Sequence, residues 1–156
     1  SSPRRPPRAP LPPSSAASDV YKRQDLVLVK GKECFILMNL YPYSNGHIMI
    51  SPYKHTSDTN DISDRCNNEI MFFSNETMNI LRSTMNAEGF NFGANLGKAG
   101  GAGIEEHIHY HIVPRGVGDT NFMPVVGNTK VVVEGLVETW NNLKPQFDTI
   151  LGNANA

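Results

Sequence analysis

The heptapeptide "HIHYHIV" (residues 107–113) most constrains the fold, because its first six residues alternate histidine with an apolar or aromatic residue. Alternate side chains of a β-strand point to opposite faces, so this period predicts a strand with one polar and one apolar face. We expect His107, His109 and His111 to share the polar face, at a spacing of roughly 6.6 Å between neighbours. Three of the five histidines in the chain would then lie on one strand.

Four further segments read as strands, since they are rich in apolar residues and bounded by turn formers: residues 25–30, 34–40, 47–53 and 90–97. The first two flank a short turn and indicate a hairpin. His47 opens the third segment directly after Gly46. Strands that meet as hairpins predict a largely antiparallel sheet.

Two segments show helical spacing. Between residues 60 and 90, apolar side chains recur at mostly three- and four-residue intervals, with Asp61 or Asp64 as the N-cap and Gly89 as the C-terminal stop. We expect this long helix to bury one stripe: Ile70, Phe73, Met78, Leu81 and Met85. Residues 131–147 start as a β-branched run and become a terminal helix that presents on one face Leu136, Trp140 and Leu143. The predicted class is α+β, with a five-stranded sheet, one long helix and one C-terminal helix.

The bulk composition fits one globular domain, since 156 residues with 39% apolar content are enough for one core and too few for two comfortable ones. No apolar run approaches the roughly 18 residues of a membrane span, and no early segment resembles a signal peptide. Cys34 and Cys66 lack the spacing of a disulfide framework or a zinc site, so we expect buried thiols in a reducing compartment. These features predict a soluble, cytoplasmic protein.

The first 24 residues differ from the rest. Residues 1–13 hold six of the eleven prolines and no apolar period, which is typical of disorder. The next stretch, "SSAASDVYKRQ" (residues 14–24), matches a one-frame translation of a sequencing adapter. We therefore expect a disordered, non-native leader over residues 1–24 and a single domain over residues 25–156.

The net charge of -1 is unevenly distributed. Residues 1–24 carry five basic residues against one acidic residue, so residues 25–156 carry -5. A mildly acidic domain argues against a general nucleic-acid surface, which would show clustered Lys and Arg. We expect a small-molecule partner, with no nucleic acid and no membrane.

Three histidines on one strand face allow different chemistries. A shared zinc ion needs ligands about 2 Å away, and three residues spread along a strand cannot all converge on it. His47 and His55 do not complete a recognised ligand spacing. One or two of the histidines could simply be packed in the structure. A neutral imidazole, in contrast, can attack phosphorus and pass the bound group to a second nucleophile, which favours nucleophilic catalysis.

A glycine cluster leads into the histidine strand, with six glycines between residues 89 and 103. Glycine lets backbone N–H groups approach an anion closely, so such a loop can bind phosphate. The stretch is not a P-loop, because Ala99 stands where Ser or Thr is needed. The cluster and the histidines together predict a substrate that carries phosphates.

These motifs resemble the histidine-triad superfamily of nucleotide hydrolases and transferases. Residues 39–55, 89–107 and 111–131 are similar to the bacterial branch close to diadenosine tetraphosphate phosphorylases and hydrolases. The resemblance runs from about Leu26 to the terminal helix. It implies a histidine-triad fold for residues 25–156, usually as a homodimer whose subunits join their sheets.

The resemblance also implies roles for the histidines. His109 would be the nucleophile that takes a nucleoside monophosphate from the α-phosphate of a dinucleoside polyphosphate or related nucleotide. His111 and His47 would contact phosphate oxygens and the leaving group. His107 would hold His109 in orientation, chiefly through its backbone carbonyl.

Four other positions would bind the nucleotide. Asn39 matches a residue that binds ribose hydroxyls, and Asn95 would line the phosphate path with the backbone from Gly101 to Gly103. No cofactor or protein-bound metal is required, and Mg²⁺ would enter only with a polyphosphate substrate. A nucleotide sensor without catalysis and a metal-dependent hydrolase are the two alternatives.

Two segments depart from the pattern of the relatives. Many carry a Gln-Ser or Gln-Thr pair shortly before the first triad histidine, whereas this chain reads Gly103-Ile104-Glu105-Glu106, which removes a side-chain donor near the leaving group. The bacterial branch often has Trp after the Pro-Arg pair, where this chain has Gly116. Both departures bear on substrate preference.

Overall fold

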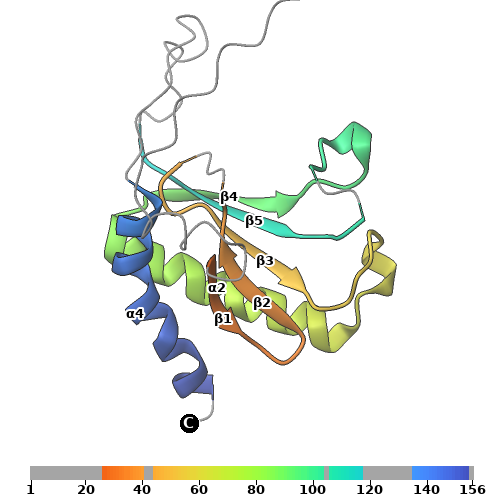
Figure 1. The fold of residues 1–156 in the computed structure, drawn as a ribbon, viewed down its shortest axis with the longest axis horizontal. Helices are drawn as coiled ribbons and strands as arrows, with labels where there is room; N and C mark the ends of the chain where they lie inside the picture. Colours follow the sequence, from red (N-terminus) through yellow and green to blue (C-terminus); the bar gives the residue numbers. More distant parts are fainter. Residues whose placement is uncertain (1–25, 41–43, 104–105, 118–134, 155–156) are drawn as a thin grey trace, which may run out of the picture.

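The computed structural model describes residues 26–40, 44–103, 106–117 and 135–154, and the leader predicted over residues 1–24 lies outside them. Its five-stranded sheet has the order β1-β2-β3-β5-β4, with every neighbouring pair antiparallel (Figure 1). The strands are β1 (Val27–Lys30), β2 (Cys34–Met38), β3 (Ile48–Pro52), β4 (Gly89–Ala94) and β5 (Tyr110–Arg115). The predicted α+β class and antiparallel sheet are confirmed.

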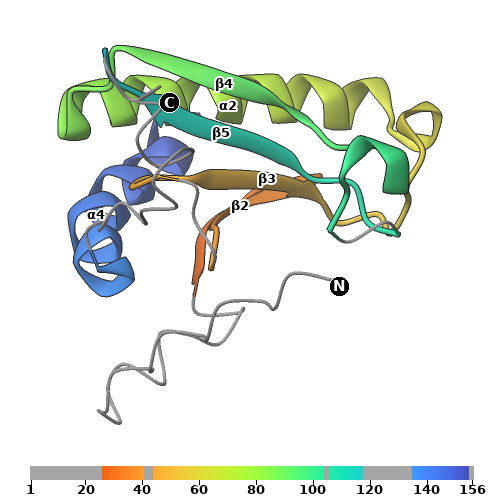
Figure 2. The same cartoon turned by 90° about the horizontal axis from the view of Figure 1, so that it is seen from above.

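Two long helices accompany the sheet, α2 (Asp64–Met85) and α4 (Leu136–Ala154). Helix α2 packs against β2, β3 and β5, whereas α4 packs against β1 and against α2. Figure 2 shows α2 running along the sheet and α4 at one end of it. Two 3-10 helices, η2 (Thr59–Asp61) and η3 (Lys98–Gly100), lie in the connecting segments. No helix in the described ranges is long and apolar enough to cross a membrane.

The ends of α2 differ from the prediction. Its N-cap is Ser63, whose hydroxyl accepts the N–H of Cys66 at 3.1 Å, and neither Asp61 nor Asp64. Serine and aspartate are about equally preferred at the N-cap, so residue type alone did not show which of them precedes the first helical turn. The helix ends at Met85, and its C-cap residue Asn86 adopts a left-handed φ of 53°. Gly89 is the first residue of β4 instead.

The core lies between the sheet and the two helices. Within the predicted stripe of α2, Ile70, Phe73 and Leu81 are buried, while Met78 and Met85 are partly buried at its border. Helix α4 buries Leu143, Phe147 and Ile150. Its residues Leu136 and Trp140 are partly buried. Residues 131–134, the β-branched run before α4, lie outside the described residues.

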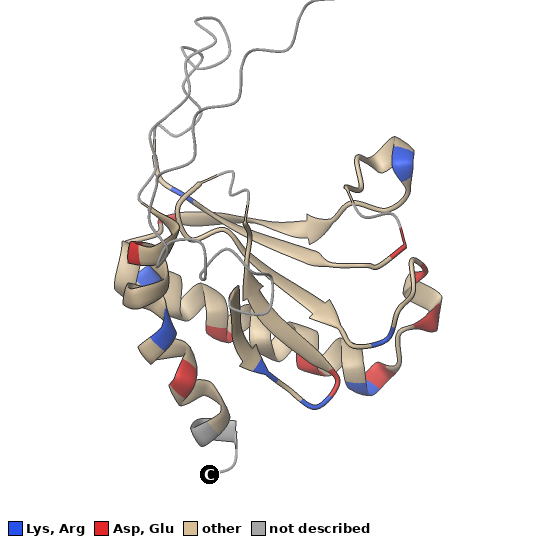
Figure 3. Cartoon of the chain, in the orientation of Figure 1, with Lys and Arg blue, Asp and Glu red and all other residues tan. Residues whose placement is uncertain are grey.

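Both cysteines, Cys34 and Cys66, are buried free thiols, as predicted. Burial is the first cause that raises the pKa of each thiol, and nearby carboxylates add to it. Charged residues of both signs lie on the helices and connecting segments, while the central strands carry few (Figure 3). The strands therefore present mainly neutral groups where they carry the histidines.

Candidate active site

The pairing of the central strands places His111 on one face of the sheet. His111 lies opposite Met49 on β3, and Met49 lies opposite Leu37 on β2. Residues that face each other across antiparallel strands project from the same face, so these three side chains share it. They are half-buried, whereas the next pair along the strands, Ile48 and Ile112, is fully buried in the core. His111 thus belongs to the face away from the core.

His47 reaches the same place from the turn before β3. Gly46 has a φ of 75°, a conformation that glycine adopts without strain, and the N–H of His47 donates to the carbonyl of Ser44 at 3.2 Å. The residue is 1% exposed, and Nε2 of its ring lies 2.9 Å from Nδ1 of His111. The side-chain nitrogen of Asn39 lies 3.3 Å from Nδ1 of His47. Asn39 and His47 therefore form a hydrogen-bonded unit with His111.

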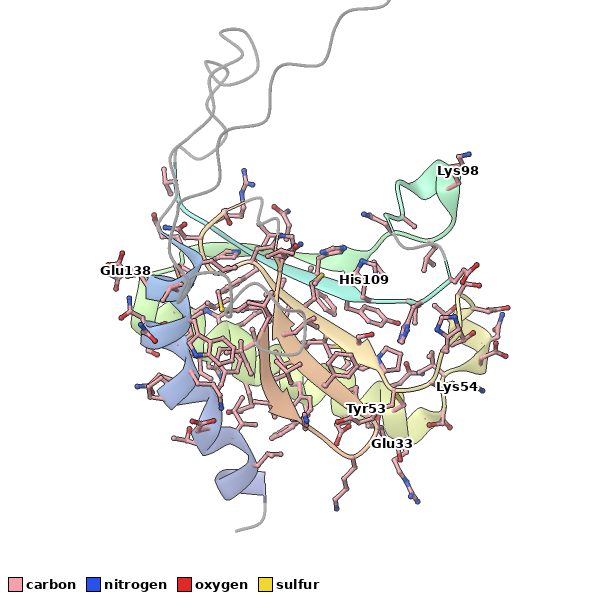
Figure 4. All side chains as sticks on the ribbon, viewed as in Figure 1. Glu33, Tyr53, Lys54, Lys98, His109 and Glu138 are labelled. Carbon is pink, nitrogen blue, oxygen red and sulfur yellow. The ribbon has the colours of Figure 1, made fainter. Side chains whose placement is uncertain are left out.

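His109 lies at the N-terminal end of β5 (Figure 4). Its Nδ1 is 3.0 Å from the backbone carbonyl oxygen of His107. A carbonyl only accepts, so Nδ1 carries the proton in this contact, and in the neutral ring Nε2 keeps its lone pair. The ring centroid lies 4.8 Å from that of His111. The neutral form of His109 therefore presents Nε2 as its unprotonated nitrogen, in a group of histidines.

His107 has a different environment. Its Nε2 donates to the carbonyl of Pro52 at 2.8 Å, and its ring lies 5.1 Å from that of His55. The predicted strand over residues 107–113 is too long, since β5 begins at Tyr110. Proline has no N–H to donate to a ladder, so Pro52 helps to end the pairing of β3 with β5. His107 and His109 precede the regular strand.

Three residues that hold this segment were missed by sequence reasoning. The N–H of Ile108 donates to the carbonyl of Thr56 at 2.8 Å, and the Ser51 hydroxyl donates to the carbonyl of Ile108 at 3.3 Å. These contacts hold the two peptide units between His107 and His109, and the carbonyl of Pro52 holds the ring of His107. Ser, Pro and Thr carry no signal of their own at these positions, because each contact joins segments more than fifty residues apart in sequence.

The remaining predicted site residues lie in the loop after β4. Asn95 is half-buried directly after the strand, while Gly101 and Gly103 are exposed beyond η3. Gly97 and Gly101 have φ values of 69° and 83°, which favour glycine. The described contacts join Asn39 to the histidines. None of these contacts includes Asn95, Gly101 or Gly103.

Burial keeps two of the rings neutral. The pKa of His47 is lowered to about 4, chiefly by burial and also by positive charge on His111 and His109. Burial also lowers the pKa of His111, again with a contribution from His109. At neutral pH both rings are therefore uncharged hydrogen-bonding groups. The described part of the chain contains no group of three or more His, Cys, Asp or Glu side chains that could hold a metal ion.

This burial predicts a loss of stability in acid. Between its usual pKa of 6.5 and about 4, His47 is protonated in the unfolded chain and neutral in the folded one. The unfolded state then binds more protons, so the free energy of unfolding falls as the pH drops through this window, by up to about 3 kcal/mol from His47. Urea unfolding from pH 7 to pH 4 should show a weaker decline for His47→Asn than for the wild type. Parallel declines would contradict the prediction.

The comparisons with known proteins agree with this architecture. Residues 21–117 match the family model described as the HIT domain. An AP-4-A phosphorylase from Mycobacterium tuberculosis is 35% identical over 131 residues, which cover 84% of this chain and 67% of that protein. A bis(5'-adenosyl)-triphosphatase from Dictyostelium discoideum is 26% identical over 93 residues, 60% of this chain and 62% of that protein.

A solved structure gives the same fold. A zinc-bound histidine triad family protein from Mycobacterium smegmatis superposes with a TM-score of 0.65 at 22% identity, covering 89% of this chain and 95% of that one. At this level of sequence identity the match supports the fold alone. Membership of the family follows from the family model, because its match spans more than half of the chain. The chain belongs to the histidine-triad (HIT) family, and its relatives support a nucleotide hydrolase or transferase activity.

Proposed function

We propose that the protein splits dinucleoside polyphosphates or related nucleotides by transferring a nucleoside monophosphate to His109. The observation that carries this proposal is the hydrogen bond from Nδ1 of His109 to the carbonyl of His107, 3.0 Å long. That bond leaves Nε2 with a free electron pair, as a nucleophile requires. The similarity to a protein named AP-4-A phosphorylase supports the substrate class.

The reaction would proceed in two displacements. Nε2 of His109 attacks the α-phosphorus, a P–N bond forms, and the bond to the bridging oxygen breaks, so the polyphosphate product leaves with that electron pair. Water or inorganic phosphate then attacks the same phosphorus, and the P–N bond breaks and returns its electron pair to Nε2. Splitting one difficult step into two easier ones is the advantage of covalent catalysis.

The neighbouring groups would stabilise the charge that develops on the phosphate. His47 and His111 are held by the 2.9 Å contact between them, and both are neutral at physiological pH. Fixed donors in a water-poor site stabilise a transition state without reorganising. In this proposal Asn39 takes the ribose, and Asn95, Gly101 and Gly103 take the phosphates. Mg²⁺ would accompany the polyphosphate, and the protein itself would need no cofactor.

We further propose that the active form is a cytoplasmic homodimer. Strand β4 is at the edge of the sheet, and its residues Asn91, Phe92 and Gly93 are exposed. An edge strand presents unpaired backbone groups on which a second copy can add its own strand. This supports the joining of two sheets across β4.

The test is to incubate the full chain with diadenosine tetraphosphate and MgCl₂, with and without inorganic phosphate, and to separate the products by chromatography. ADP plus ATP formed only with phosphate would establish a phosphorylase, and AMP plus ATP formed with water would establish a hydrolase. Intact-protein mass spectrometry after a denaturing quench at alkaline pH should show one covalently bound AMP.

Two outcomes would overturn the proposal. Binding of the dinucleotide without products or adduct would favour a sensor. Turnover that stops with a chelator in the absence of added Mg²⁺, together with metal bound to the purified protein, would favour a metal-dependent hydrolase.

A further inference from the structure

We infer that Thr56 is a positioning residue for His109, acting through the peptide group between His107 and Ile108. The inference rests on the proposed function, because it explains how the nucleophile is oriented for that reaction. Thr56 is separated from His109 by more than fifty residues in sequence, and its side chain does not touch the triad rings in the described contacts. Its effect would be transmitted by the backbone.

The peptide group between His107 and Ile108 has both of its polar groups engaged. Its carbonyl oxygen accepts the Nδ1 proton of His109 at 3.0 Å. Its N–H, which belongs to Ile108, donates to the carbonyl of Thr56 at 2.8 Å. Because a peptide unit is planar, the direction of the N–H determines the direction of the C=O. The Thr56 carbonyl therefore sets where the acceptor for His109 points.

Thr56 is itself held by its hydroxyl. The residue is 8% exposed, and its Oγ1 donates to Oδ2 of Asp61 at 2.7 Å while accepting the N–H of Asp58 at 3.1 Å. A hydrogen bond to a carboxylate is among the stronger ones in proteins. The hydroxyl thus ties Thr56 to the short helix η2, whose N-cap is Asp58.

The regular sheet does not orient the peptide group between His107 and Ile108. The pairing of β3 with β5 ends at Ile50 and Tyr110, and that of β4 with β5 ends at Ala94 and Tyr110, so the regular ladder stops short of the peptide group between His107 and Ile108. The other contacts of the segment go to the His107 ring and to the carbonyl of Ile108, and neither touches the peptide group that binds His109. Among the described contacts, the hydrogen bond to the Thr56 carbonyl is the one that orients the plane of this peptide group.

The test compares Thr56→Val with Thr56→Ser. Valine keeps the branched shape and the backbone carbonyl and removes the hydroxyl, whereas serine keeps the hydroxyl. We expect Thr56→Val to lower kcat about tenfold with KM nearly unchanged, since a small misplacement of a reacting group is costly. Thr56→Ser should restore most of kcat. The matched control is Thr84→Val on α2, where the lost hydroxyl bond to Ile80 is remote from the histidines, and it should leave kcat unchanged.

A second readout does not depend on turnover. Nitrogen NMR of the imidazole rings should show one tautomer of His109 in the wild type, protonated at Nδ1, and a mixture in Thr56→Val. If the wild type turns over no dinucleotide, the proposed function fails, yet this comparison still decides the role of Thr56. An unchanged tautomer and kcat in a folded Thr56→Val would overturn the inference.

A further variant covers the case in which Thr56→Val does not fold. Asp61→Asn weakens the same anchor from an exposed position by removing the charge of the acceptor. It should shift the tautomer balance of His109 and lower kcat in the same direction by a smaller factor. No shift in a folded Asp61→Asn protein would count against the inference.

Discussion

His109→Ala should lower the turnover of diadenosine tetraphosphate by about 10⁴-fold or more, since removal of a nucleophile abolishes the covalent route. Its folding should be nearly unchanged, because the ring is half-buried and its described hydrogen bond goes to a backbone carbonyl. Steady-state kinetics and urea unfolding of the same preparation measure both effects. The AMP adduct should also be absent.

The matched control is His55→Ala. His55 is 68% exposed and contacts the ring of His107, so it lies close to the site without belonging to the triad group. We expect its turnover to stay within a few-fold of the wild type. A His109→Ala protein that keeps normal activity would exclude the nucleotidyl-histidine mechanism.

Glu69→Ala should lower the free energy of unfolding by about 3 kcal/mol, because the Glu69 carboxylate accepts three backbone hydrogen bonds. These come from Lys32, Glu33 and Cys34 at 2.9, 2.6 and 2.8 Å. They join α2 to the turn between β1 and β2. Removing the carboxylate leaves three N–H groups without their acceptor, and urea denaturation with circular dichroism measures the loss. Glu76, which makes no described hydrogen bond from the same helix, is the control, and Glu76→Ala should change stability by less than about 0.5 kcal/mol.

The contribution of Glu69 should depend on pH with a definite sign. Burial acts to raise the pKa of its carboxyl, but the backbone donors outweigh burial, so the pKa lies below its ordinary value of 4.5. A depressed carboxyl pKa contributes stability above the ordinary value and loses it as the pH falls through the folded one. The difference between wild type and Glu69→Ala should therefore shrink below about pH 4. A difference that is constant from pH 7 to pH 3 would contradict this assignment.

Local patterns in the sequence were enough to predict the α+β class and the positions of its main strands and helices, and they suggested a phosphate-binding site. Alternation located the strand that carries His111, and helical spacing located α2 and its buried stripe, because both periods follow from local backbone geometry. The three histidines and the glycine cluster predicted phosphate chemistry, and the resemblance to the histidine-triad superfamily added His47. The HIT family model matches residues 21–117.

The contacts that hold the histidines could not be read from local patterns and appear in the folded chain. That β5 starts at Tyr110, that His107 turns its ring towards Pro52 and His55, and that Thr56 holds the peptide group behind His109 all depend on contacts between distant segments. The same holds for Glu69, whose carboxylate accepts hydrogen bonds from three backbone N–H groups of a distant segment. Local periodicity is encoded residue by residue, whereas hydrogen bonds across the fold exist only once the strands and helices have packed.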